Sequence, residues 1–119
     1  MSGSEITIYH NPRCSKSRQS LQRIRDAGFE PTVVEYLQAP PTVDELDRIL
    51  TKLSLEPIDV MRRKEVAFLE LGLGSADLSR ADAIATMVQN PVLIERPIVV
   101  RGDQAVIGRP PENVNQLLG

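Results

Sequence analysis

The first third of the chain alternates between apolar and polar positions and then changes to a helical period. Residues 5–9 alternate and predict a strand. After a polar loop, Leu21 and Ile24 fall on one face of an otherwise polar run, which predicts an amphipathic helix. Gly28 is the expected left-handed residue after its C-terminal cap. The β-branched run 32–36 predicts a second strand, so the segment forms a βαβ unit with parallel strands.

The next stretch is predicted to be helical. Thr42 and Glu45 have the spacing of a capping box, and they precede a helix with an apolar stripe. Pro57 suits the first position of another short helix, which we expect to reach Met61.

Two further helical segments follow. Residues 68–71 predict a helical turn that ends near Gly72. Ser79 and Asp82 have the spacing of a second capping box and open another helix, which residues 90–91 close because they are Asn-Pro.

The last third returns to strands. Residues 97–101 and 104–108 are apolar, and the Gly102-Asp103 pair between them is a hairpin signal. Residues 111–118 predict a short helix. The order βαβ, helices, ββα is that of an α/β, thioredoxin-like fold with a helical insertion between its halves. With 119 residues, we expect one domain over 1–119, and the fold by itself says nothing about function.

Composition excludes several classes of protein. The net charge of −2 and a pI near 5.4 argue against a nucleic-acid binder. No apolar run has the length of a membrane span, and residues 1–4 lack the features of a signal peptide. A chain with one cysteine cannot form an internal disulfide, which suits a reducing compartment. We therefore expect a cytoplasmic protein, and a monomer.

The single cysteine, Cys14, lies in the run 10–18, which also holds the only histidine. This run connects the first strand to the first helix, so Cys14 falls at a helix N-terminus, where unpaired amides and the helix dipole favour negative charge. Arg13, Lys16 and Arg18 add cationic side chains. A lone cysteine is usually a buried structural one, but these surroundings favour a reactive thiolate.

The chain offers no second thiol to complete a redox reaction. Ser17 occupies the position at which a dithiol oxidoreductase has its resolving cysteine. A phosphatase-type Cys-x5-Arg loop is excluded, because the arginine position is Ser20. A covalent intermediate on Cys14 must therefore be resolved by an external thiol, most simply glutathione.

Three further residues are candidates for roles that support Cys14. His10 is expected to tune Cys14 or fix the loop rather than transfer a proton, and one histidine with one cysteine is too few for a metal site. Ser15 could donate a hydrogen bond to the sulfur or cap the helix. Pro97 is the candidate for a cis peptide bond beside the cysteine.

Three arginines stand apart from ordinary surface charges. Arg62 follows an apolar helix face, Arg96 precedes the most apolar strand, and Arg109 ends the hairpin. In a fold of this kind, strand ends and the N-terminus of the first helix can converge on one edge. Guanidinium groups bind tetrahedral oxyanions through paired hydrogen bonds, so these arginines suggest an oxyanion substrate.

These motifs together resemble the glutaredoxin-coupled arsenate reductase family, in particular its short chromosomal branch. The resemblance spans almost the whole chain and rests on residues 10–15, 36–42, Arg62, 70–73, 95–100 and 108–110. It implies a thioredoxin-like fold with a helical insert and no bound cofactor. It also implies that arsenate is reduced to arsenite with glutathione as co-substrate and glutaredoxin as partner.

The resemblance also assigns roles to residues. It implies that Cys14 attacks arsenate, that Asn11 belongs to the supporting motif, and that Arg62, Arg96 and Arg109 bind the oxyanion. Arg62 is chosen over Arg63 by its distance from the Glu-Leu-Gly-Leu motif at 70–73.

Two departures keep other interpretations open. Arg13 and Lys16 occupy positions that are small or neutral in the plasmid-type enzymes, which also have a longer C-terminal tail. The same superfamily includes glutathione-dependent thiol reductases and Spx-type redox regulators. Ser17 argues against a regulator, since those typically carry Cys-x-x-Cys, and the three arginines favour an oxyanion over a neutral disulfide. We therefore rank arsenate reduction first, a glutathione-dependent reductase of another small substrate second, and a redox sensor third.

Overall fold

The computed structural model describes residues 5–73 and 78–118, so the N-terminal residues considered above as a signal peptide lie outside it. The chain divides into two compact units. Residues 5–39 and 96–118 form one, called here the sheet unit, and residues 40–95 form the other, the helical unit.

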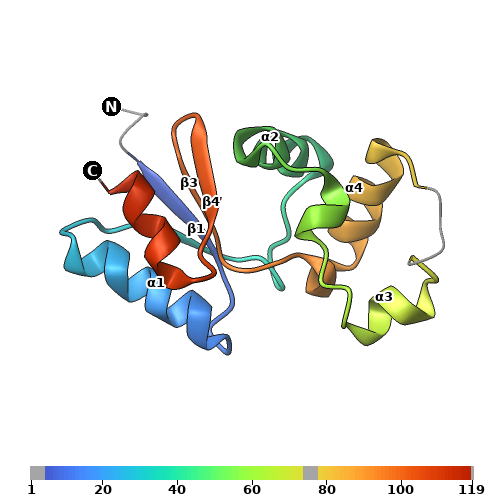
Figure 1. Ribbon diagram of the computed structural model, residues 1–119, viewed down its shortest axis with the longest axis horizontal. Helices are drawn as coiled ribbons and strands as arrows, with labels where there is room; N and C mark the ends of the chain where they lie inside the picture. The colour runs from blue at the N-terminus through green and yellow to red at the C-terminus, as the bar shows by residue number, and fades with distance from the viewer. Residues whose placement is uncertain (1–4, 74–77, 119) are drawn as a thin grey trace. The chain divides into compact units, whose positions relative to one another are not determined.

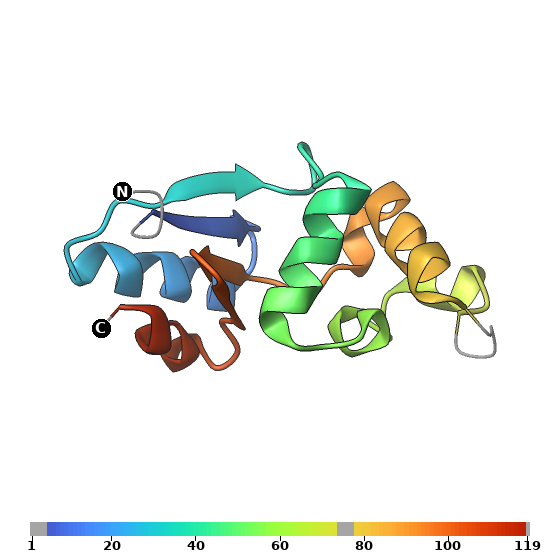
Figure 2. The same cartoon turned by 90° about the horizontal axis from the view of Figure 1, so that it is seen from above.

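The sheet unit contains a four-stranded sheet in the order β2-β1-β3-β4. Its strands are β1 (Ile6–His10), β2 (Thr32–Glu35), β3 (Ile98–Arg101) and β4 (Gln104–Ile107). Strands β1 and β2 are parallel, as expected for a βαβ unit, and Figure 2 shows them side by side and pointing the same way. Strand β3 is antiparallel to both β1 and β4.

Two helices complete this unit. Helix α1 (Ser15–Asp26) connects β1 to β2, and η4 (Pro111–Leu117), a 3₁₀ helix, follows β4. The two helices lie beside one another (Figure 1). The expected glycine after α1 is present, since Gly28 has φ 91°, and Gly102 in the β3–β4 turn has φ 60°. These values require glycine because other residues rarely adopt them.

The core of the sheet unit forms where α1 and η4 cover the sheet. Its buried residues are apolar and come from β1, α1, β3 and η4: Ile6, Ile8, Ile24, Val99, Val114 and Leu117. Leu21, which the helical period placed on the same face as Ile24, is partly buried against them. Burial of such side chains stabilises the fold by about 1.5–3 kcal/mol each.

The architecture is the thioredoxin-like fold predicted from the element order. The strands of the βαβ unit and of the antiparallel hairpin belong to one sheet, and a terminal helix follows the hairpin. The helical unit is the predicted insertion, since it leaves the sheet unit after residue 39 and returns at residue 96.

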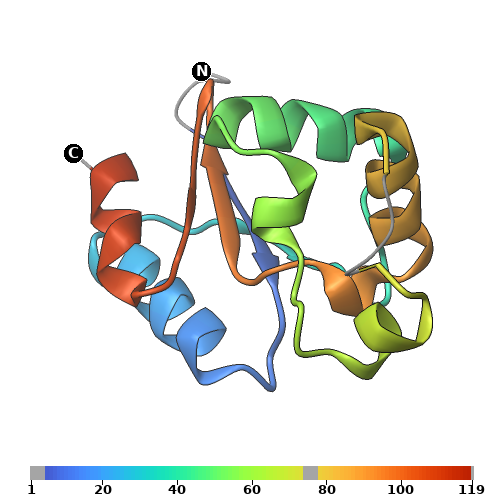
Figure 3. The same ribbon diagram turned by 45° about the vertical axis from the view of Figure 1, so that its right-hand side comes forward.

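The helical unit contains α2 (Val43–Leu53), η2 (Pro57–Val60), α3 (Val66–Glu70), α4 (Arg80–Gln89) and η3 (Pro91–Leu93). Helices α2 and α4 pack together (Figure 3). Their buried faces are apolar and consist of Leu46, Ile49 and Leu50 on α2 and of Ala83, Ile84 and Met87 on α4.

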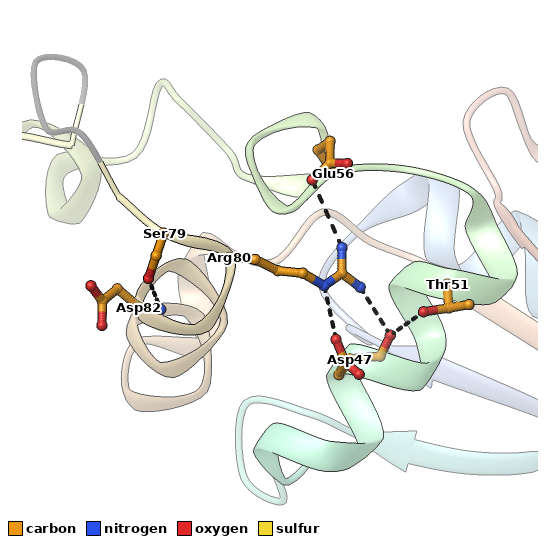
Figure 4. Close-up of polar contacts among 6 residues, drawn as sticks. All are labelled: Asp47, Thr51, Glu56, Ser79, Arg80 and Asp82. Atoms are coloured by element: carbon orange, nitrogen blue, oxygen red, sulfur yellow. Dashed lines mark hydrogen bonds and ion pairs between the residues drawn. The ribbon is translucent and has the colours of Figure 1, made fainter.

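Polar contacts fix the ends of these helices. The capping box predicted for Thr42 and Glu45 is present in both directions. At the start of α4, the Asp82 amide donates to the Ser79 hydroxyl at 3.1 Å, which is one half of the second predicted capping box (Figure 4). Arg80 then joins α4 to α2, with its Nε 2.9 Å from the Asp47 carboxylate (Figure 4).

The two ends of the helical unit are paired with each other. Met61 and Ile94 form an isolated antiparallel bridge. The Arg62 amide donates to the Leu93 carbonyl at 2.7 Å, and the Glu95 amide donates to the Val60 carbonyl at 2.8 Å. The segment that carries Arg62 is therefore tied to the segment that leads into β3.

Among the described residues, no helix has both the length and the apolar character needed to cross a membrane.

The Thr42 cap gives a test of the helical unit. We predict that Thr42→Ala lowers the free energy of unfolding by about 1 kcal/mol, because it leaves the first-turn amides of α2 without their acceptor. Thr51→Ala on the same helix is the matched control: its hydroxyl donates only to the Asp47 carbonyl four residues earlier. Its loss should be neutral or slightly stabilising. Urea unfolding of both variants measures the difference, and equal effects would contradict the role of the cap.

Candidate active site

Cys14 lies at the junction of β1 and α1, as the sequence predicts. It is the N-cap residue of α1, with extended backbone angles, and its carbonyl accepts the Arg18 amide at 3.0 Å. The helical hydrogen bonding therefore begins at the cysteine, and the amides of the first turn are available to its side chain.

The loop before Cys14 is held by hydrogen bonds within the motif. The Cys14 amide donates to the Asn11 carbonyl, and the Arg13 amide donates to Asn11 Oδ1, both at 3.0 Å. The Arg18 guanidinium donates to the Pro12 carbonyl at 2.9 Å. Asn11 thus shapes the turn that presents the thiol.

His10 and Ser17 form a buried polar pair behind this loop. His10 Nδ1 lies 2.6 Å from Ser17 Oγ, which also accepts the Asn11 amide at 3.0 Å. Since Oγ already accepts that amide proton, its own proton is available to donate to Nδ1 of a neutral imidazole. Burial lowers the pKa of His10, with Glu35 opposing the change and the Arg25 and Arg18 charges adding to it. The contacts of His10 are those of a residue that fixes the loop.

The register of the sheet brings two of the predicted arginines together. Ile98 pairs with Ile107, so the residues just outside this pair, Arg96-Pro97 and Gly108-Arg109, lie at the same end of the hairpin. Tyr9 also pairs with Ile98, so β1 delivers the cysteine loop to this end. The Arg96–Pro97 peptide bond is cis, as expected, and so is the Arg109–Pro110 bond.

Arg109 reaches the thiol directly. Its Nη1 donates to Cys14 Sγ at 3.8 Å, a contact that joins residues 95 positions apart in the sequence. Cys14 itself is only 8 % exposed, so this contact is made in a largely desolvated position. A guanidinium held there can orient an anion next to the sulfur as well as stabilise the thiolate.

The pKa of the Cys14 thiol is lowered by this environment. Burial is the largest single influence and acts to raise it, because desolvation disfavours the thiolate. The Ser17 amide, the Arg96 charge, the Lys16 amide and the Arg109 charge each act in the opposite direction and together outweigh burial. The site therefore stabilises the thiolate more than water does for a free cysteine, despite the low exposure of Cys14.

The first turn differs from one expectation and excludes one of the two alternatives given for Ser15. The positive charges that act on the thiol are those of Arg96 and Arg109, not of Arg13, Lys16 and Arg18. Arg13 and Arg18 are exposed, so water and salt screen their charges, whereas the Arg109 guanidinium donates directly to the sulfur. Ser15 does not cap the helix, because Cys14 occupies the N-cap position.

Arg62 belongs to the helical unit. Its guanidinium is 2.6 Å from the Glu65 carboxylate and donates to the Val92 carbonyl at 3.4 Å. Arg63, the alternative considered from the sequence, is exposed. Arg62 is thus the more constrained of the two.

Sequence reasoning missed the packing of Ser20. It was considered only as the position where a phosphatase loop would have arginine, yet it is completely buried and contacts Gly108 across the unit. The available signal was the spacing of Ser17, Ser20 and Ile24, which places all three on the buried face of α1.

No three histidine, cysteine or acidic side chains gather in a metal-binding arrangement within residues 5–73 and 78–118. The chemistry that the described groups support is nucleophilic attack by a thiolate next to two guanidinium groups.

The origin of the thiol pKa can be tested by removing charges one at a time. We predict that the Cys14 thiol of the parent titrates below the free value of ~8.5. Arg96→Gln and Arg109→Gln should each raise this midpoint, because each loses a charge that stabilises the thiolate. Arg13→Gln removes the same charge from the neighbouring residue and should leave the midpoint unchanged. Thiolate absorbance followed against pH measures all four proteins, and a larger shift in Arg13→Gln would restore the first-turn explanation.

The lowered pKa of His10 predicts a pH-dependent stability. The unfolded state takes up a proton near pH 6.5, above the folded-state pKa, so the free energy of unfolding should fall as the pH drops from about 6.5 through the folded value. In His10→Asn this part of the fall should disappear, because asparagine does not titrate and its amide oxygen can accept the Ser17 proton. Urea unfolding at neutral and mildly acidic pH makes the comparison. Identical pH profiles would show that His10 does not contribute.

Comparisons with known proteins agree with this geometry. Residues 9–117 match the model of the ArsC family. An arsenate reductase of Haemophilus influenzae is 43% identical over 114 residues, covering 95% of this chain and 98% of that protein. An arsenate reductase of Escherichia coli is 41% identical over 115 residues, covering 97% of this chain and 82% of that protein.

A solved structure agrees in fold as well as in sequence. An arsenate reductase from Vibrio cholerae superimposes with a TM-score of 0.92 at 46% identity, covering 96% of this chain and 98% of that one. The family match spans the cysteine loop, the helical insertion and the arginine-bearing hairpin. The chain is a member of the ArsC family.

Proposed function

We propose that this protein is an oxidoreductase that reduces arsenate to arsenite, with Cys14 as the nucleophile. The observation that carries the proposal is the contact of Arg109 with the sulfur of a cysteine whose pKa is lowered. Membership of a family whose relatives are named arsenate reductases supports the same conclusion.

In this proposal the chain supplies a nucleophile and an oxyanion site. The Cys14 thiolate attacks arsenic, an S–As bond forms, and one oxygen leaves as water after it takes up protons. Arg96 and Arg109 hold the remaining oxygens through charge-assisted hydrogen bonds, as planar guanidinium groups do. We assign the third arginine role to Arg62, which the Glu65 carboxylate orients.

The two electrons must come from outside the chain, because Ser17 stands where a resolving cysteine would be. We propose that glutathione attacks the Cys14 sulfur, so that an S–S bond forms while arsenic leaves with the electron pair as arsenite. Glutaredoxin then takes the glutathione from the mixed disulfide and frees Cys14. The sum is arsenate and two thiols giving arsenite, one disulfide and water. We propose that a reducing cytoplasm supplies both thiols and that the protein acts as a monomer.

Arsenate turnover with glutathione and glutaredoxin tests the reaction. We predict steady-state turnover in the parent protein and none in Cys14→Ser, because the hydroxyl is a far weaker nucleophile. A thioredoxin system alone should not support turnover. Activity with thioredoxin alone would contradict the assignment of glutathione as the electron donor.

The arginines distinguish arsenate from a neutral substrate. Charge-assisted hydrogen bonds contribute ~1.5–3 kcal/mol each, so Arg96→Lys and Arg109→Lys should lower arsenate turnover roughly tenfold to a hundredfold. Lysine keeps the charge, so alkylation of Cys14 by neutral iodoacetamide should change much less. Arg23→Lys on α1 is the matched control, since Arg23 pairs with Glu112 at the surface.

The same series separates the alternatives. Arg62→Lys compared with Arg63→Lys decides which of the two binds the oxyanion. Equal turnover in the parent, Arg96→Lys and Arg109→Lys would leave these arginines as ordinary charges. The better interpretation would then be a glutathione-dependent reductase of another small substrate.

A further inference from the structure

Gly108 is packed so closely that it has no room for a side chain. A Cβ built on its backbone would lie 2.4 Å from Ser20 Oγ, 3.2 Å from Ser20 Cβ and 2.8 Å from Pro97 Cγ. Contacts this short do not occur between ordinary side chains, so something would have to move.

The reason for glycine here is space and not backbone conformation. Gly28 and Gly72 have φ of 91° and 66° with nothing within 4 Å of a built Cβ, so they are needed for their angles. Gly108 has no such left-handed angle. Alanine could adopt its backbone, and the only obstacle to alanine is the contact with Ser20 and Pro97.

This contact joins the cysteine helix to both arginines. Ser20 lies on α1, six residues after Cys14, is completely buried, and its hydroxyl donates to the Gly108 carbonyl at 3.4 Å. The Gly108 amide donates to the Pro97 carbonyl at 2.9 Å. Arg96 directly precedes Pro97, and Arg109 directly follows Gly108. The contact of Ser20 with Gly108 and Pro97 therefore holds the cysteine helix against the residues next to Arg96 and Arg109.

We infer that the close approach of Gly108 to Ser20 is the positioning contact that sets the distance of Arg109 from the Cys14 thiol. The 3.8 Å contact between Nη1 and Sγ exists because helix and strand end approach without an intervening side chain. Gly108 and Ser20 touch neither sulfur nor substrate in this scheme, so they are positioning residues. The inference rests on the proposed function only in taking this site as the reactive one.

Gly108→Ala should move the strand end away from α1. The Ser20 hydroxyl could rotate away, but Ser20 Cβ and the Pro97 ring are attached to the backbone and would have to be pushed aside. At an effective dielectric constant of about 20, moving two unit charges from 4 to 5 Å apart weakens their attraction by a factor of about four in equilibrium terms.

The experiment uses readouts that need no arsenate. One is the midpoint of the Cys14 thiol titration, and the other is the ratio of its alkylation rates with iodoacetate, an anion, and iodoacetamide, which is neutral. In Gly108→Ala the midpoint should rise, because the acid dissociation constant of the thiol should fall about fourfold for the first ångström of Arg109 displacement. The rate ratio should fall as well, because the anionic reagent loses a nearby positive charge.

Gly28→Ala is the matched control. It replaces a glycine of the same unit that has a positive φ and no neighbour within 4 Å, so it should destabilise the fold while leaving both thiol readouts at the parent values. A general loss of stability would otherwise be confused with a displaced arginine.

A second substitution tests the partner. In Gly108→Ala/Ser20→Gly both Ser20 atoms, Oγ at 2.4 Å and Cβ at 3.2 Å, are gone and the Pro97 contact at 2.8 Å remains, so both readouts should move part of the way back toward the parent. If Gly108→Ala does not fold, Ser20→Thr crowds the same point from the helix side and should give the same two shifts.

The inference is overturned if folded Gly108→Ala keeps the parent midpoint and rate ratio, or if adding Ser20→Gly to it leaves the altered values unchanged. Both readouts stand whether or not arsenate is turned over. If the parent does not turn over arsenate but Gly108→Ala shows the predicted thiol shifts, the proposed function is rejected and this inference is kept. If the parent turns over arsenate but Gly108→Ala shows no thiol shifts, this inference is rejected and the proposed function is kept.

Discussion

The candidate active site depends on opposing influences on the charge of one sulfur atom. Burial of Cys14 disfavours its charged form, and backbone amides of α1 together with Arg96 and Arg109 reverse that preference. Neither influence is arranged by the cysteine loop alone. The amides require that α1 begins at Cys14, and the arginines require that the hairpin ends beside it. The pairing of β1 with β2 and with β3 brings the start of α1 and the end of the hairpin to the same end of the central strands.

The buried face of α1 near the site is polar, which is costly unless each group finds a partner. Ser17 is shared between His10 and the Asn11 amide, and Ser20 bonds to the Gly108 carbonyl. These small side chains allow the helix to approach the loop and the strand end more closely than leucine or valine would. Apolar packing resumes further along the helix at Ile24. The N-terminal end of α1 therefore lines the candidate active site, and its C-terminal part packs in the apolar core.

The helical unit has its own set of constraints. A capping box begins α2, Arg80 connects α4 to α2 and η2, and the pairing of residues 60–62 with 93–95 closes the unit. These contacts also determine the surroundings of Arg62, whose amide takes part in that pairing and whose guanidinium meets Glu65. An arginine held by a carboxylate is restricted in its orientation, so the Glu65 contact limits the directions in which the Arg62 guanidinium can point.

Local sequence patterns predict the features that depend on neighbouring residues. The element order, the Thr42 capping box, Gly28, the hairpin turn and the position of Cys14 at a helix start all follow from local patterns, because caps, turns and amphipathic periods are set within a few residues. The positive charges that act on the sulfur, in contrast, are set by contacts between segments far apart in the chain. Arg13 and Arg109 look equivalent by residue type, but the β3–β4 register carries Arg109 to the thiol across 95 positions. The same holds for Gly108, whose lack of a side chain matters only because Ser20 of a distant helix occupies that space. Contacts between remote segments depend on strand register and helix packing, and no local period encodes them.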